Sequence, residues 1–177
     1  MDAMHWQAMG KVVSAAALAI AVMVAPVRMA AQQGGDTVLK PADVQKLLPA
    51  SVYYAGQSAP AQLRNSGGIK FSDGKYVLAT MVDTSGYSTG IAAKYQAYFI
   101  TEVPLRIAGQ NLPAGVYGIG FIADNKFVVT DVGANDVLTV SSSNDAAMQR
   151  PRPLQIVADS VGGFRLYAGR SYVSLTR

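Results

Sequence analysis

The stretch RIAGQNLPAGVYGIGFIADNKFVVTDVG, residues 106 to 133, decides the fold. From Val116 onward its apolar residues alternate as in β-strands, and one Asp-Asn pair at 124 and 125 interrupts them with the composition of a tight hairpin turn. In the first of these strands, one face carries bulky side chains: Tyr117, Ile119 and Phe121. On the opposite face Gly118 and Gly120 carry no side chains, which leaves a hollow that we call the trough. The pattern predicts two antiparallel strands with one bulky and one hollow side.

Glycine inside a strand weakens it, so two glycines on one face indicate a bend or a close approach by another part of the chain. We expect the trough at Gly118 and Gly120 to be filled by an aromatic side chain or by a docked helix carrying Leu47 and Leu48. A ligand lying in the trough is the alternative. A phosphate-binding loop is excluded, because such loops precede a helix whose N-terminal amides face the anion.

Short runs rich in β-branched and aromatic residues continue to the end of the chain, separated by turn residues. They predict an all-β domain of about 8 to 10 antiparallel strands, either a sandwich or a barrel, and the strand glycines favour the closed form. The expected runs are 51–56, 68–71, 75–82, 95–103, 115–123, 126–132, 136–140, 153–159, 164–169 and 171–176.

The N-terminal part of the chain resembles an export signal. Lys11 precedes an apolar run from Val12 to Val27, which is shorter than the roughly 20 residues of a membrane span. Small residues follow, and Ala31 suits cleavage, although retention as a membrane anchor is the alternative. We therefore divide the chain into a signal peptide at 1–31, a leader with one short helix at 32–50, and a β-rich domain at 51–177. This predicts a periplasmic or secreted protein with no membrane span after cleavage.

The short helix is expected at Pro41–Leu48. Proline is favoured at the first position of a helix, and Pro49 ends it. Val44, Leu47 and Leu48 would form its buried face. Two turns are too few for an isolated helix, so it must pack on the sheet.

Removal of the signal would also remove the chain's only histidine, His5, and its only tryptophan, Trp6, and the chain has no cysteine. The remaining chain lacks the imidazole and thiol groups on which most nucleophilic triads and the usual zinc, haem and iron–sulfur sites depend. We predict no metal site and no cofactor, and we assign no catalytic residue.

One short motif resembles a known pattern. GQNLPAGVY, residues 109–117, is similar to the G-x-x-LPAG-x-Y edge of secreted bacterial β-rich domains of unknown function. The resemblance implies a strand, a turn at Pro113 to Gly115, and a second strand that begins at Val116. It implies export and a β fold, and it carries no catalytic residues.

Six residues are the candidates for ligand contact. Glu102 is the only glutamate and ends a strand on the face that also carries Tyr98. Asp83 and Tyr87 belong to the hydroxyl-rich loop at 83–90, and functional contacts concentrate on loops. The strand glycines Gly118 and Gly120 complete the set.

The net charge of +4 is modest and its basic residues are scattered, which argues against nucleic acid as a partner. Arg150 and Arg152 form only a short cationic element.

Two function classes remain. The first, which we favour, is a non-catalytic binding or envelope-associated module for an apolar small molecule, a glycan or an envelope protein. The second is an enzyme acting on glycans or small molecules through Asp, Glu or Tyr, which would need Glu102 and Asp83 or Asp131 in one cleft.

Overall fold

The computed structural model describes residues 35–177, which form two antiparallel β-sheets and two short helices. The first sheet contains β1 (Thr37–Leu39), β2 (Ser51–Tyr54), β3 (Gln57–Lys70), β4 (Tyr76–Val82), β5 (Ala97–Thr101), β8 (Gly115–Ile122), β9 (Lys126–Thr130) and β10 (Asp136–Ser141). The second contains β6 (Leu105–Ile107), β7 (Gln110–Leu112), β11 (Ser143–Asn144), β12 (Arg152–Ala158), β13 (Phe164–Gly169) and β14 (Ser171–Thr176). The helices are α1 (Pro41–Val44) and α2 (Thr89–Lys94).

The all-β prediction is confirmed, but neither sheet of the described residues closes into a barrel. Strand order is β1-β3-β4-β5-β8-β9-β10 in the first sheet, with β2 on β3, and β12-β13-β14-β6-β7 in the second, with β11 on β14. Gly118 and Gly120, which favoured a closed sheet in the sequence, instead allow other parts of the chain to pack closely on β8. The predicted signal peptide at 1–31 lies outside the described residues.

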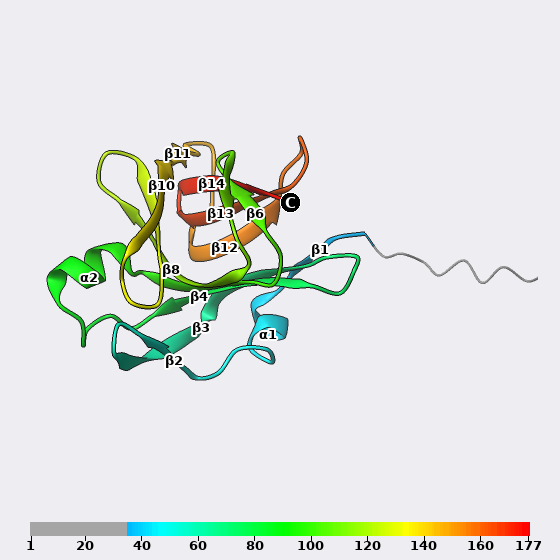
Figure 1. The fold of residues 1–177 in the computed structure, drawn as a ribbon. Helices are drawn as coiled ribbons and strands as arrows, with labels where there is room; N and C mark the ends of the chain where they lie inside the picture. The colour runs from blue at the N-terminus through cyan, green and yellow to red at the C-terminus, as the bar shows by residue number, and fades with distance from the viewer. Residues whose placement is uncertain (1–34) are drawn as a thin grey trace, which may run out of the picture. The chain divides into compact units, whose positions relative to one another are not determined.

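The chain crosses between the sheets three times. It passes from β5 to β6, returns from β7 to β8, and leaves the first sheet finally between β10 and β11. Figure 1 shows the second sheet on one side of the first, with α1 on the other side. Direct hairpins make up most of the remaining connections, as the turn residues predicted.

The main core lies between the two sheets. The bulky face of β8 contributes Tyr117 and Ile119, which are buried there with Phe99 of β5 and Leu166 of β13. A smaller cluster on the outer face of the first sheet joins Val44 and Leu48 to Leu78. The helix expected at Pro41–Leu48 is shorter in the structure, where α1 ends at Val44. Val44 and Leu48 are four residues apart and share one buried face, whereas Leu47 lies off that face and is exposed.

Three differences from the expected elements concern short or irregular segments. Residues 37–39, expected in the leader, form β1 and pair with β3. β3 begins at Gln57, eleven residues before the predicted run, and it bulges between Gln62 and Ser66. Six residues after Ser88, within the region where no helix was predicted, form α2, which buries none of its own residues.

Candidate binding site

The trough on β8 is filled by the protein itself. A Cβ atom added to Gly118 would lie 2.6 Å from the Tyr54 ring and 2.8 Å from the Tyr95 ring. At Gly120 an added Cβ would collide with the backbone carbonyl of Lys94, the last residue of α2. Aromatic side chains therefore fill the trough at Gly118, and the end of a helix fills it at Gly120. That helix is α2, whereas the sequence suggests the helix that carries Leu47 and Leu48.

The aromatic side chains above Gly118 form a tyrosine cluster, which we define as Tyr54, Tyr87, Tyr95 and Tyr98. The rings of Tyr54 and Tyr95 stack with centroids 3.6 Å apart, and Tyr87 meets them edge-on at 6.0 and 5.4 Å. The structure thus brings together three of the residues singled out in the sequence, Tyr87, Tyr98 and Gly118. Tyr54 and Tyr95 are almost fully buried, so the cluster is a packed layer.

Two of the four hydroxyls of this cluster form hydrogen bonds inside the protein. Tyr54 and Thr130 share a hydrogen bond of 2.5 Å, and Tyr87 donates to the backbone carbonyl of Tyr54 at 3.0 Å. The Tyr95 hydroxyl is buried without a partner among the described residues. Burial raises the pKa of Tyr95 and of Tyr98, so both phenols stay protonated at neutral pH.

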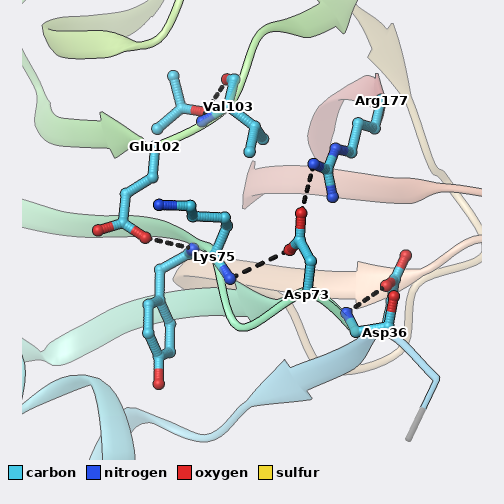
Figure 2. A network of polar contacts seen from close by, with 9 residues as sticks. Asp36, Asp73, Lys75, Glu102, Val103 and Arg177 are labelled. Carbon is cyan, nitrogen blue, oxygen red and sulfur yellow. Dashed lines mark hydrogen bonds and ion pairs between the residues drawn. The ribbon is translucent and has the colours of Figure 1, made fainter. Parts of the chain in front are cut away.

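Glu102 completes a strand end instead of facing a cleft. Its Oε2 accepts a hydrogen bond from the Tyr76 backbone N–H at 2.8 Å, as Figure 2 shows, and its own N–H donates to the Tyr76 carbonyl at 3.0 Å. Tyr76 is the first residue of β4. The carboxylate therefore caps the start of β4, an interior strand of the first sheet.

Asp83 lies at the other end of β4. Its carboxylate accepts from the Ser85 backbone N–H at 3.0 Å, which lowers its pKa and shapes the turn. Seven residues of β4 separate this turn from Glu102, roughly 20 Å at the usual rise of a strand. Paired-carboxylate hydrolysis needs the two groups within about 10 Å, so this pair does not meet that geometry.

Asp131 binds its own turn. Its Oδ1 accepts from the backbone N–H groups of Gly133 and Asn135, both at 2.9 Å. Hydrogen bonding to Asn135 lowers the pKa of this carboxyl, which stays ionised. Within residues 35–177, no three His, Cys, Asp or Glu side chains are grouped as metal ligands.

A groove lies elsewhere, at the two places where the chain passes between β5 and β6 and between β7 and β8. We call it the hairpin groove, because β6 and β7 form a hairpin that turns at Ala108 and Gly109, both with positive φ. Its volume is about 380 Å³, against about 220 Å³ beside Phe71 and about 10 Å³ beside Gly120. Its lining is Pro104, Leu105, Arg106, Asn111, Leu112, Pro113 and Arg177.

The LPAG motif builds one wall of this groove. Leu112 is fully buried and anchors the end of β7, while Pro113 is exposed at the crossing to β8. The Tyr117 hydroxyl donates to the Pro113 carbonyl at 3.1 Å and fixes the corner. The predicted turn at Pro113 to Gly115 thus joins strands of different sheets.

The two arginines that line the groove differ in whether their side chains have partners. Arg177 donates to Asp73 at 2.5 Å and lies over the Phe71 ring, 5.0 Å from its centroid. Figure 2 shows Asp73 between Arg177 and the Lys75 backbone, and the Arg177 guanidinium holds the pKa of this carboxyl below its usual value. The side chain of Arg106 has no hydrogen bond or ion pair with any residue in the part of the chain described.

None of the residues that line the hairpin groove is among the candidates predicted from the sequence. The signal available was the pair of prolines, Pro104 and Pro113, that bracket a short apolar hairpin at 105–112. Proline interrupts sheet pairing, so such residues mark points where a chain leaves a sheet.

Neither helix of residues 35–177 is long and apolar enough to cross a membrane. Comparison of the chain with protein-family models, with curated proteins and with solved structures finds no match.

Proposed function

We propose that this chain is an exported, non-catalytic binding module that receives an apolar small molecule in the hairpin groove. The observation that carries the proposal is the groove itself. Its volume of about 380 Å³ lies within the range of small-molecule sites, and most of the surface that it exposes is apolar. Export to the periplasm or the medium is proposed from the apolar N-terminal run at 12–27.

The positions of the acidic residues favour binding over catalysis. Glu102 and Asp83 lie at opposite ends of β4, and both are engaged with backbone N–H groups. An enzyme working through these carboxylates would need them around one substrate. The rigid proline walls of the groove suit a preformed binding surface, because they lose little freedom when a ligand binds.

The test is a titration of ¹⁵N-labelled protein, residues 32–177, with 1-decanol, followed by amide chemical shifts. We expect saturable shifts centred on Leu105, Arg106 and Asn111. Asn111→Trp would place a large ring in the groove and should abolish the shifts. The matched control is Ser58→Trp, at an exposed strand position in the β2–β3 hairpin, which should bind like the wild type. Absence of saturable shifts in the groove of the wild type would refute the proposal.

A further inference from the structure

The hairpin groove carries a cation that no side chain or backbone group within residues 35–177 pairs with. Arg106 and Asn111 are cross-strand partners in the β6–β7 hairpin, and both are exposed. Directly opposed residues of an antiparallel pair present their side chains on the same face. No side-chain hydrogen bond of either residue is found within residues 35–177. A guanidinium and an amide group are therefore both available on one face of the hairpin.

Nearby negative charge does not neutralise this cation. The residues that line the groove include two arginines and no aspartate or glutamate. Asp73 pairs with the groove residue Arg177 and also accepts a hydrogen bond from the Lys75 backbone N–H. Glu102, two residues before Pro104, is held by the Tyr76 N–H. The groove thus presents an apolar surface beside the guanidinium of Arg106.

We propose that the ligand of the hairpin groove is an amphipathic anion, whose carboxylate or phosphate is bound by Arg106 while its apolar part lies against Pro104 and Pro113. This inference rests on the proposed function. Guanidinium binds two oxygens of such a group in parallel, and the Asn111 amide adds a further donor. A neutral apolar ligand would leave Arg106 without a partner in the groove.

The experiment compares 1-decanol with decanoate and decyl phosphate, which share the chain length and differ in the head group. Dissociation constants are measured by amide shifts for the wild type, Arg106→Gln, Arg106→Lys and the control Arg64→Gln. Arg64 is an exposed arginine on β3, outside the groove lining. Arg106 is itself exposed, so its replacement should leave the fold intact, which the unperturbed amides of β13 would verify.

Arg106→Gln should weaken decanoate or decyl phosphate binding about fivefold, the effect of a partly exposed ion pair, and leave decanol binding unchanged. Arg106→Lys should retain part of the preference, and Arg64→Gln should change none of the constants. High salt should weaken binding of the anions only. The anion bound more tightly identifies the head group. Equal weakening of decanol and the anions, or no weakening, would overturn the inference while leaving the groove a binding site. If none of the three compounds binds the wild type, both proposals fall.

Discussion

Replacing Gly118 with alanine should destabilise the protein, because the space above this residue is already occupied. The added Cβ would lie 2.6 Å from Tyr54 Cε2, 2.7 Å from Thr130 Oγ1 and 2.8 Å from Tyr95 Cδ2. Ordinary contacts between such atoms are about 3.5 to 4 Å, so neighbours must move by about 1 Å. Neither ring is free to move alone, since Tyr54 is stacked on Tyr95 and hydrogen-bonded to Thr130.

Overpacking of this kind typically costs 1–3 kcal/mol. The gain from replacing glycine inside a strand is at most about 1 kcal/mol, and it offsets only part of the loss. Displacing Tyr54 would also weaken a buried hydrogen bond that contributes about 1 kcal/mol. We therefore expect Gly118→Ala to lower the free energy of unfolding by about 2 kcal/mol.

Urea denaturation followed by far-UV circular dichroism measures this effect on residues 32–177. The matched control is Gly90→Ala, in α2, where an added Cβ would meet nothing within 4 Å. That variant should be neutral or more stable by up to about 1 kcal/mol, because alanine restricts the unfolded chain. If Gly118→Ala unfolds within 0.5 kcal/mol of the wild type, the trough is not filled as described, and the explanation of the strand glycines fails.

Three further predictions concern the tyrosine cluster, an ion pair and the N-terminus. Tyr95→Phe should leave the urea midpoint unchanged or raise it, because the lost hydroxyl is buried and has no partner among the described residues, whereas Tyr54→Phe should lower the free energy of unfolding by about 1 kcal/mol; the reverse order would contradict the hydrogen-bond assignment. The folded-state pKa of Asp73 is lowered, so its pairing with Arg177 stabilises the fold above the unfolded pKa near 4 and is lost as pH falls through the lower folded value. Asp73→Asn should therefore unfold at lower urea than the wild type at pH 7, and the difference should vanish near pH 2; a difference independent of pH would exclude the ion pair as its cause. The intact mass of exported protein should show cleavage after Ala31, and retention of the apolar run would favour the anchor instead.

The repeated hairpins of the fold could be predicted because each is encoded locally. Asp124 and Asn125 both adopt positive φ in the three-residue turn between the paired residues Ile122 of β8 and Lys126 of β9, and Asp and Asn are residues that tolerate this conformation. The two faces of β8 also follow directly from alternation, with Tyr117 and Ile119 in the core. These features depend on neighbouring residues, so one stretch of sequence is sufficient to recognise them.

Elements stabilised by distant contacts were not predictable in this way. β1 has three residues and exists because it pairs with residues 68–70 of β3. α2 packs beside β8, where the carbonyl of Lys94 covers Gly120, although the hydroxyl-rich sequence before it indicated only a loop. In both cases tertiary contacts outweigh weak local propensity.

The candidate groove was missed for a related reason, and the reason links the fold to the proposed function. A two-sheet fold in which the chain crosses between sheets needs residues that interrupt strand pairing, and Pro104 and Pro113 stand at two successive crossings. The sequence separates them by eight residues, but the β6–β7 hairpin brings Leu105 opposite Leu112 and so places both prolines around one opening. The crossings of the chain between the sheets thus account for the two prolines, and the prolines account for the rigid apolar walls of this opening. The guanidinium of Arg106, which has no side-chain partner within residues 35–177, does not follow from these crossings, since the neighbouring strands would pair equally well with a neutral side chain there. On this residue rests our proposal that the opening is a binding surface and not a simple corner of the fold.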